Sequence, residues 1–320
     1  MLGKKKMNIQ KIAKEIKNKN VLVIGDAILD IAIFCDAVGL SLETPTLKAD
    51  KKSSTFLMGG AANVANNCAN LGIKTYFLTV LGNDEFYPKY KSWFCNNLQF
   101  YPALEKRDNI TKSRYWVARG DANYKAFQLN TGDKKGITKK SKKYILKKAK
   151  EILPFCDAMI LADYQNGVFK DQAFIDDLIN LSKTYEVLSI CNSQKSSNKF
   201  AIENFSKADL VTMNKEEALS LEIYLDKDLN LKNFSNVCIT LGSKGAVLKS
   251  DKIYSHPGYR IKTSDACGAG DSFLACLSAL DWKKYPKKSL QISNAWAALY
   301  IKNNRICSNL DKLIEFISKK

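Results

Sequence analysis

Histidine is nearly missing from this sequence, which has one histidine among 320 residues. One histidine cannot build a histidine metal site, and no nucleophilic serine motif accompanies His256, so we predict that it is a surface residue. No pair among the nine cysteines is spaced as Cys-x-x-Cys, which argues against a zinc knuckle and against a thioredoxin-like site. Any chemistry must therefore come from other side chains and from the backbone.

Long apolar runs are also missing, and none approaches the length that a membrane-spanning helix needs. The basic N-terminus, residues 1–7, has no signal-peptide core behind it, because polar and charged residues interrupt the following segment. Hydrophobic residues make up 46% of the chain, which is enough for a substantial buried core. We therefore expect a folded, cytoplasmic protein.

Acidic residues are scarce relative to basic ones, 32 against 50, and the net charge is +18. Such a balance is typical of nucleic-acid-binding proteins. The lysines, however, are spread along the chain in segments that resemble solvated helix faces, and they do not alternate with aromatic residues as in RNA-binding proteins. We expect no specific nucleic-acid partner and no membrane partner, and the positive charge could instead attract phosphorylated substrates.

The most informative segment is a loop of small residues, Cys-Gly-Ala-Gly at 267–270, which precedes the apolar segment 273–280. The loop is predicted to open a helix, with Asp271 in its first turn. Backbone N–H groups at a helix start favour an anion, and glycines let a phosphate approach. A carboxylate beside a phosphate site suits a general base, although Asp271 could also be a helix cap and the loop an ordinary turn. No Gly-Lys-Ser/Thr sequence follows, so this is not a Walker A loop.

Residues 265–273 read Asp-Ala-Cys-Gly-Ala-Gly-Asp-Ser-Phe and resemble the second signature of the ribokinase (PfkB) family of carbohydrate kinases, with Ala266 where the family often has threonine. Residues 59–72 resemble the first signature, a helix start rich in glycine. The resemblance implies a ribokinase-like α/β fold, a three-layer α/β/α sandwich with a mainly parallel sheet and a small β lid. We expect residues 1–320 to form one kinase domain, with the lid formed by about 31–57 and 110–130.

A narrower resemblance is to the bacterial D-glycero-β-D-manno-heptose-7-phosphate kinases. Those enzymes read Gly-Asp-x-x-Leu-Asp, Glu-Ala-Pro and Gly-Gly-Ala-Ala-Asn-Val-Ala; this chain matches at 25–30, at 43–45 with Thr44 for alanine, and at 59–65. The resemblance implies phosphorylation of a heptose 7-phosphate at its anomeric hydroxyl, in the synthesis of a lipopolysaccharide precursor. Two alternatives stay open: a kinase for another sugar or sugar phosphate of the fructose or ribose type, and a sugar- or nucleotide-binding regulatory protein with weakened catalysis.

Candidate substrate ligands follow the first predicted strand, because ligands gather at the carboxyl ends of parallel strands. Asp26 and Asp30 could accept hydrogen bonds from sugar hydroxyls, although Asp26 could also be a turn residue. Lys112 and Arg114 share one face of a predicted strand, which suits a second phosphate on the substrate or, alternatively, a sheet edge protected by charge. The resemblance adds Gly59, Gly60, Asp163 and Asn63, the last of which could instead be a helix-surface amide.

The resemblance also implies a nucleotide site. Asn214 and Glu217 match the family's Asn-x-x-Glu motif, which organises Mg²⁺ and phosphate, and the same pair is compatible with a helix capping box. The chain departs from the heptose-kinase pattern at Asn166, which replaces a basic residue, and at 192–194, which replace Asp-Pro-Lys; Lys195 could supply the missing charge. The further predicted nucleotide ligands are Asn192, Thr240, Gly242, Gly245, Cys267 and Asn294, and Asp265 is predicted to shape a K⁺ site.

The predicted reaction is transfer of the γ-phosphoryl group of ATP to a sugar hydroxyl, with Asp271 as the base. The backbone amides of Gly268, Ala269 and Gly270 would stabilise charge on the moving phosphoryl group, and Mg²⁺ would be positioned indirectly through Asn214 and Glu217. We expect a small sugar phosphate as the substrate and a homodimer that is joined through the lid strands.

Overall fold

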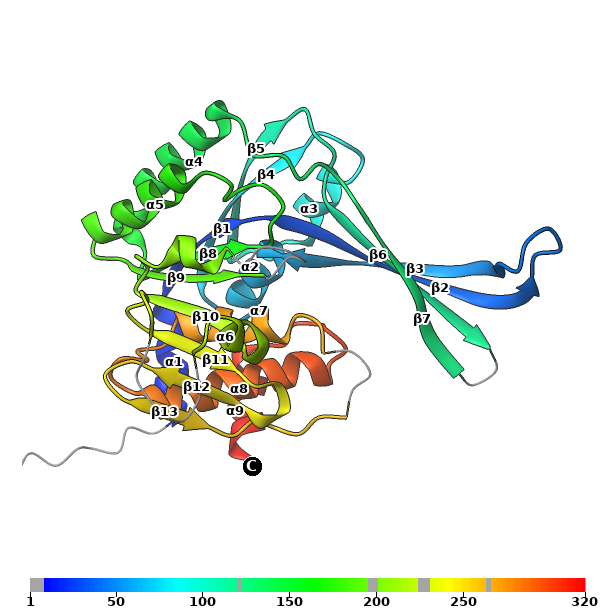
Figure 1. Ribbon diagram of the computed structural model, residues 1–320. Helices are drawn as coiled ribbons and strands as arrows, with labels where there is room; N and C mark the ends of the chain where they lie inside the picture. Colours follow the sequence, from blue (N-terminus) through cyan, green and yellow to red (C-terminus); the bar gives the residue numbers. More distant parts are fainter. Residues whose placement is uncertain (1–8, 120–121, 195–200, 224–230, 263–265, 320) are drawn as a thin grey trace, which may run out of the picture.

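The computed structural model describes residues 9–119, 122–194, 201–223, 231–262 and 266–319. A nine-stranded sheet forms the centre of the molecule, in the order β13-β12-β11-β10-β9-β8-β1-β4-β5 (Figure 1). Strands β5 to β11 of this order are parallel, and β12 and β13 pair antiparallel at one edge. The bounds are β1 Asn20–Gly25, β4 Lys74–Gly82, β5 Leu98–Glu105, β8 Ala158–Asp163, β9 Leu188–Ser193, β10 Leu210–Asn214, β11 Val237–Thr240, β12 Ala246–Lys249 and β13 Ile253–His256.

Helices cover both faces of this sheet, because its central strands are apolar on both sides. Val21 and Val23 of β1 belong to one apolar core, and Leu22 and Ile24 belong to a second core on the opposite face. The first core includes residues of α1 (Ile9–Glu15), α2 (Ala61–Asn70), α3 (Tyr87–Trp93), α7 (Ala269–Ser278), α8 (Pro286–Lys302) and α9 (Leu310–Ser318); the second includes residues of α4 (Lys139–Ile152), α5 (Gln172–Thr184) and α6 (Lys215–Ser220). The predicted mainly parallel α/β architecture is confirmed.

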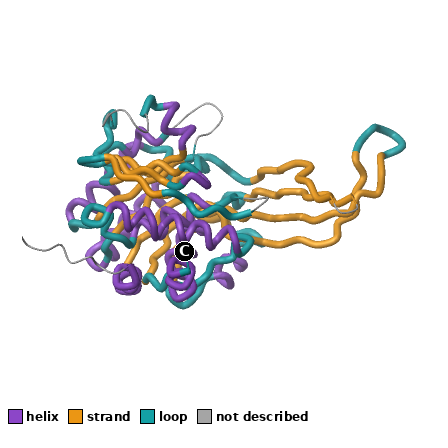
Figure 2. Tube along the Cα trace, turned by 90° about the horizontal axis from the view of Figure 1, so that it is seen from below, coloured by secondary structure: helices purple, strands orange, loops and turns teal. Residues whose placement is uncertain are grey.

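A second sheet of four strands projects from this body as a long arm (Figure 2). Its order is β3-β2-β6-β7, with bounds β2 Ala27–Leu40, β3 Leu47–Gly60, β6 Thr111–Arg119 and β7 Ala122–Thr131. The sequence predicts only short strands between 31 and 57, whereas β2 and β3 each have 14 residues. Outside the body neither face of these strands is fully buried, so hydrophobic alternation does not mark their ends.

Local chain chemistry explains where two helices begin. The helix predicted from Gly59 begins at Ala61, because Gly60 precedes it with a φ of 59°, which favours glycine. The basic helix α4 begins at Lys139, because the Thr138 side chain accepts a hydrogen bond from the Ser141 backbone N–H and caps it. Within the described part of the chain, no helix combines the length and the apolar character that a membrane crossing requires.

The sheet order fixes where a ligand can bind. Strand β1 lies in the sheet between β4 on one side and β8 on the other, so the connections diverge at its carboxyl end. In open parallel sheets such a point leaves a crevice for ligands. The loops after β1 and β8, and the lid strands that follow β1 directly, therefore border the expected site.

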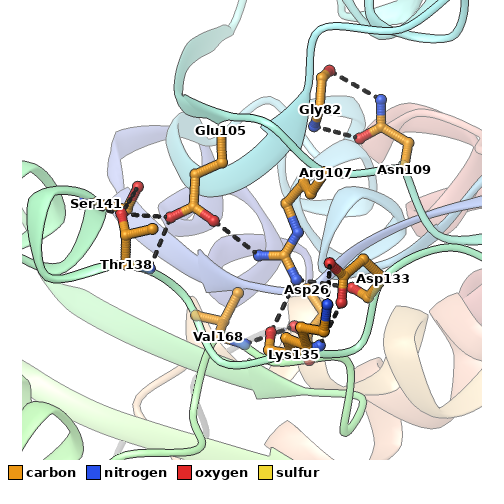
Figure 3. A network of polar contacts seen from close by, with 10 residues as sticks. All are labelled: Asp26, Gly82, Glu105, Arg107, Asn109, Asp133, Lys135, Thr138, Ser141 and Val168. Carbon is orange, nitrogen blue, oxygen red and sulfur yellow. Dashed lines mark hydrogen bonds and ion pairs between the residues drawn. The ribbon is translucent and has the colours of Figure 1, made fainter.

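A polar network connects the base of the lid to the second helical layer (Figure 3). Arg107, just after β5, donates hydrogen bonds to the carbonyl oxygens of Asp133 at 2.7 Å and Lys135 at 2.9 Å, and pairs with Glu105 at 3.4 Å. Glu105 in turn accepts hydrogen bonds from the backbone N–H and hydroxyl of Thr138 at the start of α4. The segment between β5 and β6 and the segment between β7 and α4 are thereby linked to each other by hydrogen bonds at the base of the lid.

Candidate active site

Asp271 is the third residue of α7, as the loop motif predicts. Gly268 precedes the helix in the left-handed region, with a φ of 82°. A Cβ atom at Gly268 would lie 2.9 Å from the Asn63 side-chain nitrogen and 3.0 Å from the Tyr300 ring. Glycine is thus required at this position both by the backbone conformation and by the close approach of α2 and α8.

Two side chains hold the Asp271 carboxylate. The Asn63 amide donates a hydrogen bond to one oxygen at 2.8 Å, and the Tyr164 hydroxyl donates one to the other at 2.5 Å. Asn63 is 2% exposed, and its own oxygen accepts hydrogen bonds from Tyr300 and Asn67. The observed contact of the Asn63 amide positions Asp271, and its predicted sugar contact stays a prediction.

The environment of Asp271 makes it a stronger base than an ordinary aspartate. Burial raises the pKa of Asp271, while the hydrogen bonds from Tyr164 and Asn63 lower it in part. Burial and the charge of Asp271 raise the pKa of Tyr164 well above its usual value, so Tyr164 stays protonated and donates. A carboxylate with a raised pKa, held by two donors, is suited to accept a proton.

The backbone amides of the 267–270 loop are not equivalent. The Ala269 N–H donates to the Ala266 carbonyl oxygen at 3.2 Å, and its role in binding a phosphoryl group stays a prediction. Gly270 has open space where a Cβ atom would lie, and both Gly268 and Gly270 line a cavity beside Asp271.

This cavity has a volume of about 180 Å³ and lies at the carboxyl ends of β8 to β11. It brings together the loop glycines, Asp271 and four of the predicted nucleotide ligands, namely Asn192, Asn214, Glu217 and Thr240. The Oδ1 atom of Asn192 is buried and has no hydrogen-bond partner among the described residues. A buried, unsatisfied acceptor at the wall of a polar cavity indicates that a ligand or a water completes the site.

Asn214 and Glu217 form the capping box of α6. The Asn214 side chain accepts from the Glu217 backbone N–H at 2.9 Å, and the Glu217 carboxylate accepts from the Asn214 N–H at 2.8 Å. Among the described residues, no group of three or more His, Cys, Asp and Glu side chains could enclose a metal ion. Mg²⁺ is commonly held by one or two carboxylates together with substrate phosphates and water, which this cavity could provide through Glu217.

Four predicted nucleotide residues lie outside this cavity lining: Gly242, Gly245, Asn294 and Cys267, the last of which is described below. Gly242 and Gly245 belong to the turn between β11 and β12, where both have positive φ and a Cβ atom at Gly245 would lie 2.1 Å from the His256 carbonyl oxygen. Asn294 of α8 donates to the carbonyl oxygens of His256 at 3.2 Å and Pro257 at 3.4 Å. Their observed contacts shape loops, and their nucleotide roles stay predictions.

On the other side of Asp271, the predicted sugar ligand Asp30 is 5% exposed and contacts two arginines. Its carboxylate lies 2.9 Å from the Arg114 guanidinium and 2.5 Å from that of Arg305. Lys112 is the register partner of Asp30 on the neighbouring strand. A Cβ atom at Gly59 would approach the Asp30 carboxylate at 3.1 Å, so Gly59 leaves room for this cluster.

The other two predicted substrate carboxylates contact neighbouring parts of the chain, and their sugar contacts stay predictions. The Asp26 oxygens accept hydrogen bonds from the backbone N–H groups of Tyr164, Asn166 and Val168. Asp163 accepts from Gln165 and from the Ser193 hydroxyl. Burial raises the pKa of both carboxyls, and the neighbouring charge of Asp26 helps to raise the pKa of Asp163 to about 7.

The structure also places the positions where the chain departs from the heptose-kinase pattern. Asn166 is buried and donates to the Tyr164 carbonyl oxygen, while Gln194 lines the cavity. Cys267 is predicted at the nucleotide, but its sulfur accepts from the Arg114 guanidinium at 3.7 Å, toward the Asp30 cluster. Lys195 and Asp265, with the predicted K⁺ site, lie outside the described residues.

Sequence reasoning missed three residues of the site: Tyr164, Tyr300 and Arg305. Tyr164 lies in the Asp-Tyr-x-x-Gly segment after β8, and its position at a strand end was an available signal. Arg305 follows α8 in a turn without a recognisable motif, and no local feature of the sequence connects it with Asp30, 275 positions away.

The arrangement suits a phosphotransferase, because a carboxylate at a glycine-rich helix start lines a polar cavity and also interacts with the charges of Asp30 and Arg305. The sequence profile of the pfkB family carbohydrate kinases matches residues 18–161 and 165–313. The chain therefore belongs to this family, whose members transfer a phosphoryl group to an alcohol acceptor and use ATP with Mg²⁺.

Among individual relatives, the chain is 28% identical over 301 residues to the "Bifunctional protein HldE" of Helicobacter acinonychis, covering 88% of this chain and 63% of that protein. The HldE protein of Sulfurimonas denitrificans is 27% identical over 296 residues, with 88% of this chain and 60% of the relative covered. The chain thus spans about three-fifths of the length of these relatives.

Solved structures show the ribokinase-like fold. Phosphofructokinase-2 from Escherichia coli in complex with fructose-6-phosphate superposes with a TM-score of 0.72 at 15% identity, covering 94% of this chain and 99% of the other. Ribokinase from Arabidopsis thaliana, complexed with ribose and ATP, superposes with a TM-score of 0.69 at 16% identity, covering 93% and 98%. A further structure of the E. coli enzyme is in complex with potassium.

Proposed function

We propose that this protein transfers the γ-phosphoryl group of ATP to a hydroxyl of a sugar phosphate. One observation carries the proposal: Asp271 lines the polar cavity and also lies within electrostatic reach of Asp30 and Arg305. A group between a nucleotide-type cavity and an ionic cluster can receive the proton of a hydroxyl that attacks the nucleotide phosphate.

The residues of the cavity support binding of a nucleoside triphosphate. Gly268 and Gly270 permit close approach of phosphate oxygens. The Oδ1 atom of Asn192 can accept a hydrogen bond from a donor such as a ribose hydroxyl or a bound water. Mg²⁺, when bound with ATP, neutralises phosphate charge, and Glu217 is the cavity carboxylate that would help to hold it. We assign Asn214, Thr240, Gly242, Gly245 and Asn294 to the same nucleotide.

Different residues of this chain have different proposed roles in catalysis. Asp271 accepts the hydroxyl proton, while Tyr164 and Asn63 hold its carboxylate in position. The start of α7 presents backbone N–H groups at the same point, where negative charge moves during the transfer. Asp30 is the carboxylate proposed to bind a sugar hydroxyl.

A heptose 7-phosphate, phosphorylated at its anomeric hydroxyl for lipopolysaccharide synthesis, is the proposed substrate. Support comes from the HldE relatives, from the paired Asp30 and Arg114, and from Lys112 beside them. Fructose or ribose and their phosphates are the competing acceptors.

We test the function by measuring ADP release from Mg-ATP with heptose 7-phosphate, fructose, ribose and the phosphates of the last two. Asp271→Asn is the matched control, because it keeps the shape of the side chain and removes the base. Turnover on one acceptor that is lost in the variant supports the kinase. ATP binding without turnover on any acceptor favours a regulatory protein with weakened catalysis.

The lid is proposed to pair with the lid of a second copy. Strand β2 exposes Val38 and Leu40, and the edge strand β7 exposes Phe127 and Leu129, with exposed fractions from 47% to 65%. Exposed apolar residues on a projecting sheet favour association. Light scattering coupled to size-exclusion chromatography should give twice the chain mass, and Phe127→Glu should shift it toward the monomer; a monomeric wild type contradicts this assignment.

A further inference from the structure

Arg305 combines two unusual features. Its φ is 67° and that of the preceding Asn304 is 52°, so two consecutive residues other than glycine adopt left-handed backbone conformations. Such conformations are unfavourable for L-residues and persist where surrounding contacts compensate. Backbone hydrogen bonds close this turn, because the Asn304 N–H donates to the Ile301 carbonyl oxygen and the Arg305 N–H donates to the Tyr300 carbonyl oxygen, both at 3.0 Å. The Arg305 side chain is 10% exposed and lies 2.5 Å from the Asp30 carboxylate, so the turn after α8 places a guanidinium beside Asp30.

Asp30 already has a cationic partner from the lid. Arg114 of β6 is 11% exposed and lies 2.9 Å from the other Asp30 oxygen, so one carboxylate holds two guanidinium groups. The same oxygens are those proposed to accept a sugar hydroxyl. A neutral sugar would have to compete with two buried ion pairs for Asp30, and separating buried charges without a replacement partner is costly.

A phosphate group offsets this cost for the two arginines, because it gives each guanidinium a replacement partner. It carries a charge close to −2 at neutral pH and presents oxygens that match the planar fork of a guanidinium, so it can replace Asp30 as the partner of an arginine. Lys112, in register with Asp30, adds a third cation on the same strand face as Arg114. Cys267, which contacts Arg114 at 3.7 Å, places the cluster beside the loop that leads to Asp271.

We propose that Arg305, with Arg114, is the specificity-determining element that selects a phosphorylated acceptor sugar. The phosphate of the sugar takes over the two guanidinium groups, and the released Asp30 carboxylate accepts a hydroxyl of the same sugar. This inference rests on the proposed function for the identity of the site. It makes Arg305, which lies outside the signature motifs, the residue that discriminates between a sugar phosphate and its parent sugar.

The test measures binding without nucleotide, by calorimetry, for three pairs: fructose 6-phosphate and fructose, ribose 5-phosphate and ribose, and a heptose 7-phosphate and its heptose. We expect the wild type to favour the phosphorylated member of at least one pair by about tenfold or more. Arg305→Gly, which suits the left-handed backbone, should reduce this ratio by about tenfold, and Arg305→Lys should restore part of it.

Asn304→Gly is the matched control, because it changes the neighbouring left-handed residue and leaves the guanidinium in place. It should retain the wild-type ratio. A wild type without phosphate preference in any pair overturns the inference, and so does an Arg305→Gly variant that keeps the wild-type ratio. If Arg305→Gly does not fold, judged by circular dichroism, Arg305→Lys and Arg114→Lys decide by the same ratio.

The outcomes separate the inference from the proposed function. A phosphate preference that depends on Arg305, without ADP release on any of these acceptors, leaves the inference standing and contradicts the kinase proposal for them. ADP release that is equally efficient with a sugar and its phosphate supports the kinase and overturns the inference.

Discussion

The two sides of Asp271 differ in the way they are built. The proposed nucleotide side is a polar cavity whose lining includes amides, hydroxyls and glycines, with Asp271 and Glu217 as its carboxylates. The proposed acceptor side is an ionic cluster in which Asp30, Arg114 and Arg305 are nearly buried. In our proposal, a ligand enters the cavity as it is, whereas a ligand of the cluster replaces an internal ion-pair partner. Substitutions should therefore affect the two sides in different kinetic parameters.

The largest expected effect is that of Asp271→Asn, which removes the base shared by both sides. We expect kcat to fall by about 10²–10⁴-fold, with binding of Mg-ATP and of the acceptor nearly unchanged. Steady-state kinetics and calorimetric binding provide the measurement. Retention of wild-type kcat would show that Asp271 is only a residue of the helix start.

Glu217→Gln isolates the nucleotide side. Glutamine can keep the capping-box hydrogen bond to Asn214 while losing the negative charge proposed to hold Mg²⁺. We expect KM for Mg-ATP to rise by about tenfold, with acceptor affinity unchanged. Glu217→Ala is the comparison variant, since it also breaks the cap; equal kinetics for wild type and Glu217→Gln would leave Glu217 a structural role alone.

Tyr164→Phe tests how a hydrogen bond sets the pKa of the Asp271 carboxylate. The Tyr164 hydrogen bond lowers the pKa of Asp271, so its removal should raise that pKa and move the acidic limb of the kcat/KM profile to higher pH. We expect kcat to fall by about tenfold or less. Tyr300→Phe, which alters a donor to Asn63, should move the limb less; an unchanged limb in Tyr164→Phe would contradict the assignment.

The last expected effect concerns stability rather than kinetics and is that of Asp163. Its pKa is raised to about 7, so the folded state binds a proton that the unfolded state has released, and this contribution to stability falls as pH rises from about 4 to 7. The amide that Asp163→Asn introduces cannot titrate. The free energy of unfolding of this variant, relative to the wild type, should therefore increase by about 2 kcal/mol between about pH 5 and pH 7.5 in urea titrations. A pH-independent difference would contradict this.

The sequence indicated more of the residues that line the polar cavity than of those that form the ionic cluster, and the reason is physical. The loop before α7 and the capping box of α6 are local, so their residue spacing alone indicates helix starts and the groups presented there. Asp30, Arg114 and Arg305 come from three separated parts of the chain, and only the packed fold brings them together. The hydrogen-bond partners of Asp26 and Asn63 could not be predicted either, because a sequence motif does not specify which distant groups a polar side chain contacts.

The alternation of strands and helices was predictable because parallel strands buried on both faces give continuous apolar runs. The length of β2 and β3 was not predictable, because most residues of their outer halves are exposed or half-buried and carry no periodic signal. The start of α4 at Lys139 depends on the Thr138 cap, and the lysine-rich composition of the segment does not indicate that boundary.

The hydrogen bonds around Asp271 have a consequence for the cooperativity of the molecule. Asn63 and Asp271 are 208 positions apart, Tyr164 and Asp271 are 107 apart, and Arg305 and Asp30 are 275 apart. No short contiguous fragment of the chain contains these partners, so the site exists only when both ends of the chain are docked on the sheet. Loss of activity on heating should accordingly coincide with global unfolding, and two fragments cut on the surface should regain activity only when they reassociate.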